Sequence, residues 1–261
     1  MHPTLNIAIK AARKAGNVII RSMDQLDTLS VTAKGRNDFV SEVDRQAEQE
    51  IIKIIRKAFP SHGILAEEGG FHEGDDYQWI IDPLDGTTNF LHGFPQFAVS
   101  IALQHKGRLE HAVVYDPLRQ EIFSASRGAG AHVNERRIRV SKAKGLEGTL
   151  LGTGFPFRHM THLESYIAIL KDLIPQTAGI RRPGSAALDL AYVAAGRLDG
   201  FWEYGLQPWD IAAGALLVQE AGGILSDFTG GSDYMKSGNV VAGNAKVLKA
   251  IVQTIHRHTA G

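Results

Sequence analysis

Apolar side chains recur every three to four residues in two segments near the N-terminus. From Thr4 to about Met23 the repeating positions are Leu5, Ala8, Ile9, Ala12, Ala15 and Ile19. This spacing predicts an amphipathic helix with one buried face. A second helix is predicted from Ser41 to about Ala58, and Pro60 ends it. A polar stretch, Thr32 to Asp38, lies between the two helices.

Short apolar runs dominate the middle of the chain and predict strands. The runs are Ile64–Ala66, Gln78–Ile81, Phe97–Gln104, Leu109–Tyr115 and Glu121–Ala125. Lys106-Gly107-Arg108 separates the third run from the fourth and is typical of a hairpin turn. The pattern therefore predicts an antiparallel meander.

Helical spacing returns in the second half, with short apolar segments such as Gly200–Glu203 between the helices. The predicted helices cover about His162–Leu173, Ser185–Ala195, Ile211–Ala221 and Ala245–His256. Gly222-Gly223 marks the end of the third helix. Mixed helices and strands predict one compact α/β unit over residues 1–261, with closely packed halves at about 1–140 and 141–261.

Composition excludes several classes of protein. The chain has 261 residues, 44% of them hydrophobic, which is ordinary for a globular protein, and it has no cysteine. A disulfide framework, a thiolate zinc site and a cysteine nucleophile are thereby excluded. Lys plus Arg and Asp plus Glu both number 28, so the formal net charge is zero, which argues against a protein that coats nucleic acid. The small basic cluster at Arg136, Arg137 and Arg139 is interpreted as a solvated strand edge.

Localisation follows from what the sequence lacks. No apolar run reaches the length of a membrane span. The start, Met1-His2-Pro3, has no basic region followed by an apolar one, so we expect no secretory signal. We expect a cytoplasmic protein with no membrane partner.

Four acidic residues stand at the predicted ends of strands and at the start of a helix. Glu67 follows the first short strand, Asp82 the second, Asp85 comes three residues later, and Asp210 opens a helix. Carboxylates in such positions can converge on one cleft. Because like charges a few Å apart repel, a cluster of this kind needs cations, and magnesium prefers these oxygen ligands.

Taken one at a time, these acids have ordinary structural explanations. Asp210 suits a helix N-terminus, Asp44 completes a capping box with Ser41, and Asp85-Gly86 is a turn signal. The combination in residues 82–90, DPLDGTTNF, is more specific, because it joins two acids, a bend, a glycine and two hydroxyls. Backbone amides and hydroxyls of Gly86, Thr87 and Thr88 can cradle a phosphate.

These motifs carry a family resemblance. DPLDGTTNF at 82–90 and PWDIAAGALLVQEAGG at 208–223 resemble the two signatures of the inositol monophosphatase family, in its bacterial branch. Glu67-Glu68 and DFVSEVD at 38–44 stand in the expected order, and the resemblance extends from the first helix to about Gly243. The family comprises lithium-sensitive, magnesium-dependent phosphatases. The resemblance implies a five-layer αβαβα sandwich that forms a homodimer.

The resemblance also implies roles for individual residues. Glu67, Asp82 and the carbonyl of Leu84 would hold one magnesium ion. Asp82, Asp85 and Asp210 would hold a second, and Glu67 would contribute to a third, weaker one. Asp44 and Thr87, with Glu67, would orient and help deprotonate the attacking water. The implied phosphate and substrate contacts are Gly86, Thr87, Thr88, Gly184, Ser185, Ala186, Glu203 and Asp210.

Two aspects of the site stay open at this stage. Arg181 and Arg182 bear either on the substrate or on a subunit contact. No histidine falls in either signature, so His92, His159 and His162 are interpreted as surface or loop residues.

Three functions compete. The first is hydrolysis of a small phosphate monoester, above all myo-inositol 1-phosphate. The second keeps the chemistry but changes the substrate to a sugar bisphosphate or NADP. The third is an accessory factor of transcription antitermination that binds RNA polymerase or RNA, because the bacterial branch contains such a member.

Overall fold

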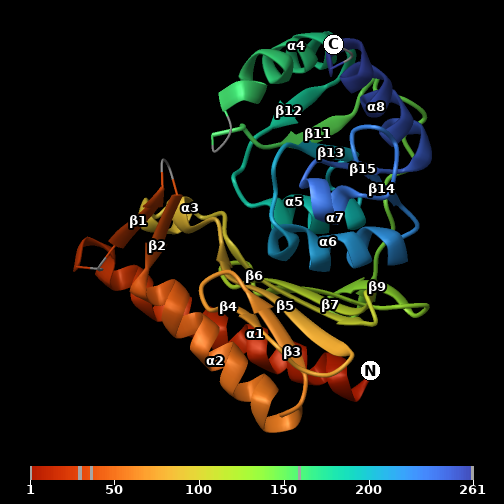
Figure 1. The fold of residues 1–261 in the computed structure, drawn as a ribbon. Coiled ribbons are helices and arrows are strands. Elements are labelled where there is room, and N and C mark those ends of the chain that lie inside the picture. The colour runs from red at the N-terminus through yellow and green to blue at the C-terminus, as the bar shows by residue number, and fades with distance from the viewer. Residues whose placement is uncertain (1, 29–30, 36–37, 158–159, 260–261) are drawn as a thin grey trace.

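The chain folds into five stacked layers of alternating helix and sheet. The computed structural model describes residues 2–28, 31–35, 38–157 and 160–259. Figure 1 shows an outer helix pair, a large sheet, a central helix pair, a smaller sheet and a second outer helix pair. The helices of the three α layers are α1 (Pro3–Ser22) and α2 (Glu42–Ala58), α5 (Ala186–Ala194) and α6 (Pro208–Glu220), and α4 (Leu163–Leu173) and α8 (Ala245–Thr259). The predicted αβαβα sandwich is confirmed.

The large sheet has eight strands in the order β10-β9-β8-β7-β6-β5-β3-β4. All neighbours in it are antiparallel except β3 and β5, so the predicted meander is confirmed. Lys106 and Gly107 have φ of 49° and 77°, as the two-residue turn between β6 and β7 requires. The bounds are β3 (Gly63–Ala66), β4 (Gly70–His72), β5 (Tyr77–Asp85), β6 (Ala98–His105), β7 (Arg108–Asp116), β8 (Glu121–Ser126), β9 (Gly130–Val133) and β10 (Arg136–Arg137).

Helices α1 and α2 cover the outer face of this sheet, as their apolar stripes predict. Small residues of α1, among them Ala11, Ala12 and Ala15, are fully buried and allow close packing. Ser41 caps α2, and Asp44 closes the predicted capping box. The packed helices bury one hydrophobic core between themselves and the sheet.

The smaller sheet has five strands in the order β12-β11-β13-β15-β14 and lies on the other side of α5 and α6. Because α6 lies between two sheets, every residue from Ile211 to Val218 is buried. A second core fills this central layer, and a third lies under α4 and α8. The strands are β11 (Leu150–Thr153), β12 (Gly179–Arg181), β13 (Gly200–Glu203), β14 (Ile224–Ser226) and β15 (Val240–Gly243).

The polar stretch near residue 35 forms a small hairpin that the sequence pattern did not predict. Strands β1 (Val31–Gly35) and β2 (Asp38–Ser41) pair antiparallel, and residues 36 and 37 lie outside the described ranges. The remaining short elements are η1 (Met23–Thr28), α3 (Thr87–Leu91), η2 (Met160–His162), η3 (Ile174–Gln176) and α7 (Tyr234–Ser237). Within the described ranges, no helix combines the length and apolarity that a membrane crossing needs.

Candidate active site

A cavity of about 580 Å³ opens between the two halves of the chain. All the predicted site residues except Asp44 line it, and Asp44 lies behind Thr87. The lining residues from the sequence prediction are Glu67, Asp82, Leu84, Asp85, Gly86, Thr87, Thr88, Gly184, Ser185, Ala186, Glu203 and Asp210. The cavity therefore gathers residues from β5, from the loops that follow β3 and β12, and from the N-terminal turns of α5 and α6.

A β-bulge brings two of the acids to the same side of the large sheet. Asp82 was predicted to follow a strand that ends at Ile81, but β5 continues to Asp85. Asp82 pairs with Ser100 and Asp85 with Ala98, so three steps along β5 match two along β6. Residues three apart in a regular strand face opposite sides, and the extra residue cancels that reversal. Pro83, which has no N–H, is tolerated because it stands within the bulge.

Three carboxylates converge at this bulge. Asp82, Asp85 and Asp210 each offer a carboxylate oxygen, and these oxygens lie within 4.8 Å of one another. Asp210 is the third residue of α6, and its Oδ2 accepts a hydrogen bond of 2.7 Å from the Gln207 amide. The helix cap therefore fixes the position from which Asp210 faces the two acids of β5.

Repulsion among these carboxylates makes the cluster a site that favours a cation. Asp82 is buried, and burial raises the pKa of its carboxyl well above the ordinary value; repulsion from Glu67, Asp85 and Asp210 raises it further. A divalent cation would remove this repulsion. The donor set consists of carboxylate oxygens with a backbone carbonyl nearby, which suits a hard ion such as magnesium. The residues present therefore fit a divalent metal site.

Asp44 and Thr87 form a hydrogen-bonded pair at the edge of the cluster. The Thr87 hydroxyl lies 2.9 Å from Asp44 Oδ1 and 3.0 Å from the Leu84 carbonyl oxygen. Asp44 Oδ2 accepts hydrogen bonds from the amide and the hydroxyl of Ser41, at 2.8 and 2.6 Å. Burial raises the pKa of the Asp44 carboxyl, and these hydrogen bonds oppose the rise. A buried carboxylate is thus held behind a hydroxyl that faces the cavity.

The turn at Gly184 brings the second half of the chain against Asp85. Ser185 Oγ donates a hydrogen bond of 2.6 Å to Asp85 Oδ2, and the Ala187 amide donates one of 2.8 Å to the same oxygen. Gly86 has a φ of 95°, and a Cβ there would lie 2.8 Å from the Gln96 carbonyl oxygen and 3.3 Å from that of Gly184. Only glycine permits this close approach of the two backbones.

Glu203 lies at the end of β13 on the far side of the cavity, where its carboxylate packs over Gly154. Behind it, Asp189 of α5 is buried, and its Oδ1 has no hydrogen-bond partner in the described part of the chain. Burial, and next the charge of Glu203, raise the pKa of Asp189 well above its ordinary value. No sequence signal marks Asp189, because its position in α5 looks like any helix interior.

The cavity is also lined by residues outside the two family signatures. Arg182 lines it, and its guanidinium lies 5.2 Å from the ring centre of Phe155 and 4.9 Å from that of Phe157. Arg181 is absent from the lining residues. His92, interpreted as a surface residue, is exposed and also lines the cavity. His162 stacks on Tyr204, and His159 lies outside the described residues.

Comparison with known proteins gives one consistent family. The model of the inositol monophosphatase family matches residues 1–260. A relative from Pseudomonas aeruginosa named Nus factor SuhB is 61% identical, over 99% of this chain and 97% of its own. The crystal structure of the extragenic suppressor protein suhB from Bartonella henselae is 46% identical with a TM-score of 0.95, covering 97% of this chain and 98% of that one. Inositol monophosphatase II of Staphylococcus aureus, solved with inositol monophosphate bound, is 27% identical with a TM-score of 0.82, covering 99% and 96%.

Proposed function

Because the chain belongs to the inositol monophosphatase family, we propose that it is a magnesium-dependent phosphatase that hydrolyses myo-inositol 1-phosphate and similar monoesters. The observation that carries this proposal is the carboxylate cluster of Asp82, Asp85 and Asp210 beside the Asp44–Thr87 pair in one cavity. An acidic cluster alone would indicate only a cation site. The Thr87 hydroxyl beside the cluster is polarised by Asp44 and can activate a water molecule, which indicates hydrolysis.

The acids divide between the ions in the way that the family resemblance implies. In this proposal, Glu67, Asp82 and the carbonyl of Leu84 hold one magnesium ion, and Asp82, Asp85 and Asp210 hold the second. Glu67 also contributes to a third, weaker one. Asp82 is central to both sets, which agrees with the strong electrostatic influence of Glu67, Asp85 and Asp210 on its carboxyl. When bound, magnesium supplies positive charge to the phosphate oxygens and makes water a stronger acid.

The Asp44–Thr87 pair prepares the attacking water. Since the Thr87 hydroxyl donates its proton toward Asp44, its lone pairs are available to accept a proton from water in the cavity. The raised pKa of Asp44 makes its carboxylate a better final proton acceptor than an exposed aspartate. The water oxygen then bonds to phosphorus, the ester P–O bond breaks, and the leaving oxygen takes up a proton from solvent in the open cavity, so that the organic part leaves as the alcohol. Glu67, which lines the same cavity, assists in this step.

Phosphate and alcohol are held by different parts of the cavity. Gly86, Thr87 and Thr88 offer backbone amides and hydroxyls to the phosphate, and Thr88 is exposed to the cavity. Glu203 accepts hydrogen bonds from the hydroxyls of a cyclitol, with Gly184, Ser185, Ala186 and Asp210 completing the substrate contacts. The inositol monophosphate in the Staphylococcus aureus relative supports this choice of substrate.

A substrate panel tests the specificity. We expect the kcat/KM for myo-inositol 1-phosphate to exceed that for fructose 1,6-bisphosphate and for NADP by at least about fivefold, because one hydrogen-bonded hydroxyl contributes roughly 1 kcal/mol or more. A preference for a bisphosphate or for NADP would transfer the proposal to the second substrate class. The same assay with lithium added tests the lithium sensitivity that we propose with the family chemistry.

We also propose that the protein acts as a homodimer in the cytoplasm. Two-fold pairing is the commonest oligomeric form, and Phe94 and Ile174, which do not line the cavity, are large apolar side chains exposed on the single chain. Sedimentation equilibrium gives the mass directly. A mass that stays at 28.4 kDa across micromolar concentrations would exclude the dimer.

A second function is favoured by the relatives' name. The Pseudomonas aeruginosa relative is called a Nus factor, and we propose that this chain also binds RNA polymerase or its antitermination factors. The basic cluster supplies a surface for this role, since Arg136, Arg137 and Arg139 are exposed and form no ion pair within the described residues. Pulldown with polymerase subunits and with RNA tests the proposal, using a variant with all three arginines changed to glutamine as the control. If the wild type and the variant capture polymerase or RNA equally, the basic cluster is not the binding surface. If neither captures them, the proposed transcription role is excluded.

A further inference from the structure

The side-chain amide of Asn89 connects three separate parts of the chain. Asn89 belongs to the short helix α3 and lies within the motif at 82–90 that also carries Asp82 and Asp85. Its Nδ2 donates to the carbonyl oxygens of Gln96 at 2.7 Å and Pro183 at 2.9 Å, and lies 3.3 Å from that of Gly184. An amide nitrogen has two hydrogens, so the two short bonds use both. Asn89 thereby fastens the turn before α5 to the first half of the chain, across 94 residues.

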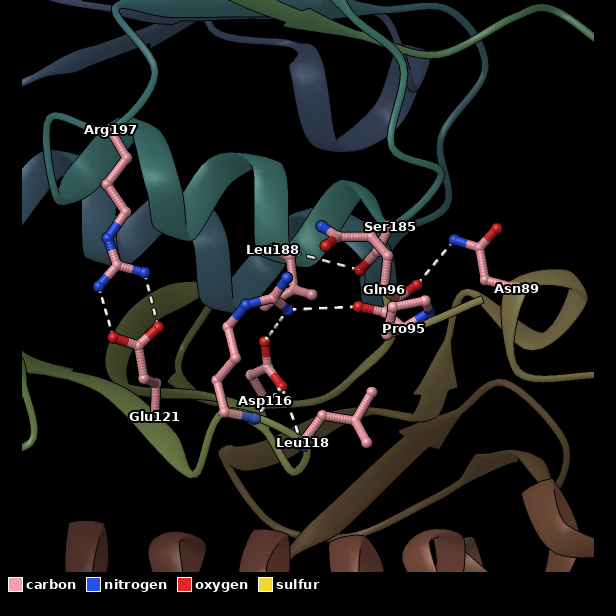
Figure 2. A network of polar contacts seen from close by, with 10 residues as sticks. Asn89, Pro95, Gln96, Asp116, Leu118, Glu121, Ser185, Leu188 and Arg197 are labelled. Atoms are coloured by element: carbon pink, nitrogen blue, oxygen red, sulfur yellow. Dashed lines mark hydrogen bonds and ion pairs between the residues drawn. The ribbon is translucent and has the colours of Figure 1, made fainter. Parts of the chain in front are cut away.

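The partner segment around Gln96 is fixed from its other side. Arg119 donates to the Pro95 carbonyl oxygen at 3.3 Å and forms an ion pair of 2.8 Å with Asp116, whose side chain is buried. Figure 2 shows Asp116, Pro95, Gln96 and Asn89 along one line of polar contacts, with Ser185 next to them. Because Gln96 and Pro95 are anchored to the large sheet, Asn89 ties the Gly184 turn to a rigid support.

The fastened turn carries the groups that hold Asp85. Ser185 and Ala187, one and three residues beyond Gly184, donate 2.6 and 2.8 Å hydrogen bonds to Asp85 Oδ2. These two bonds fix the rotamer of a carboxylate that must meet Asp82 and Asp210 within 4.8 Å. A shift of the turn would move both donors away from Asp85 together.

We propose that Asn89 is a positioning residue for the metal site: it holds the Gly184 turn so that Ser185 and Ala187 orient the Asp85 carboxylate. This inference rests on the proposed function, in which Asp85 is a metal ligand. Partners that orient a metal ligand contribute about 10- to 100-fold to metal affinity. The effect of losing Asn89 should therefore be on magnesium binding more than on turnover at saturating magnesium.

Magnesium titration of the wild type and four variants by calorimetry tests the proposal, with the half-activating magnesium concentration as a second readout. Asn89→Ala and Ser185→Ala should each weaken magnesium binding by about tenfold or more. Because both act on Asp85 through the same turn, the double variant should lose less than the product of the two single losses. Asn244→Ala is the matched control, since the Asn244 amide also donates to two distant carbonyls, those of Ser141 and Ala143 at 3.0 Å each.

The outcomes separate a positioning role from a purely structural one. Asn244→Ala should lower the melting temperature and leave magnesium affinity unchanged. Asn89→Ala with wild-type magnesium affinity, or with a loss that simply multiplies with that of Ser185→Ala, would overturn the inference. If Asn89→Ala does not fold, Asn89→Ser, which keeps one donor, replaces it and is judged by the same criteria. Asp85→Asn separates a failure of the Asn89 inference from a failure of the proposed metal site, because wild-type magnesium affinity in that variant would refute the metal site itself.

Discussion

The Thr87 hydroxyl lies 2.9 Å from Asp44 Oδ1, although 43 positions separate the two residues in the chain. Asp44 has two functions in this arrangement. One carboxylate oxygen closes the capping box of α2, and the other faces Thr87 at the cavity. A residue that stabilises a helix start is thereby held rigidly at the position where the proposed mechanism needs a proton acceptor.

Replacing the Thr87 hydroxyl should separate turnover from metal binding. We expect Thr87→Val to lower kcat by about 100-fold or more, since a positioned proton acceptor contributes roughly 10²–10⁴. Magnesium affinity, measured by calorimetry, should stay within about twofold, because the carboxylate cluster is intact. Thr88→Val is the matched control: it removes a neighbouring hydroxyl for which the structure shows no bond to Asp44, and it should raise KM rather than lower kcat. Equal effects of both variants on kcat would contradict the assignment.

Neutralising one acid of the cluster should abolish activity without harming the fold. In Asp85→Asn, the side chain keeps its shape and can still accept a hydrogen bond from Ser185. We expect a loss of turnover of at least about 1000-fold, together with a metal-free melting temperature equal to or above that of the wild type, because repulsion with Asp82 is reduced. Phosphate release and thermal denaturation without magnesium measure the two effects. Near-normal turnover would mean that Asp85 is not a ligand.

The stabilisation by magnesium should grow with pH. The pKa of Asp82 is raised in the folded protein and ordinary in the unfolded chain, so ionising it costs stability. The metal-free fold therefore loses stability as pH rises through the raised pKa, and regains it as pH falls. Magnesium binds the ionised form, so its addition should raise the melting temperature more at pH 8 than at pH 5.5.

Asp82→Asn serves as the control for this dependence. It removes the ionising group, so the gain from magnesium should become small and nearly independent of pH. A gain in the wild type that is equal at both pH values would show that the cluster does not bind the ion in its ionised form.

The ion pair between Arg197 and Glu121 is remote from the cluster, and its contribution to the stability of the fold should depend on pH in the opposite sense. Arg197 makes a two-pronged contact with Glu121, with one bond of 2.6 Å (Figure 2). Its guanidinium lies over the rings of Phe123 and Tyr192. The hydrogen bonds from Arg197 lower the pKa of Glu121. The stability that this pair contributes is therefore present above the ordinary pKa of glutamate and is lost as pH falls through the lowered value.

Glu121→Gln measures that contribution. We expect a loss of about 1 kcal/mol in the free energy of unfolding at pH 7, shrinking toward zero as pH falls through the lowered pKa of Glu121. Glu110→Gln breaks a pair in which the Arg127 nitrogen lies 3.3 Å from the carboxylate, and should cost less. Equal losses of unfolding free energy in the two variants at pH 7 would show that the two-pronged geometry of the Glu121 pair adds no stability.

Periodicity was sufficient for most of the fold but not for the geometry of the site. Helix α2 begins at Glu42 and ends at Ala58, as its apolar spacing and Ser41 predict. Strand β5 was predicted to stop at Ile81, because Pro83 normally ends a strand. The bulge that carries the strand through Pro83 depends on pairing with β6, and local sequence cannot show that pairing.

The family signatures located the acids, whereas the residues that support them emerged only from the structure. Asn89 stands inside the quoted motif, yet its partners Pro183 and Gly184 lie in the other half of the chain. Phe155 and Phe157 look like ordinary loop residues until the structure places the Arg182 guanidinium over both rings at the cavity. Contacts between distant segments are the information that a single sequence lacks.

The most direct test of the central claim is phosphate release from myo-inositol 1-phosphate, with and without magnesium, by the wild type and by Asp210→Asn. Asp210 belongs to the carboxylate cluster, and asparagine can still accept the hydrogen bond of the Gln207 amide, so the fold should be unaffected. Release that requires magnesium and is lost in the variant is the predicted result. A folded wild-type protein that binds magnesium but releases no phosphate from this or related monoesters would contradict the phosphatase assignment and leave the transcription role as the better account.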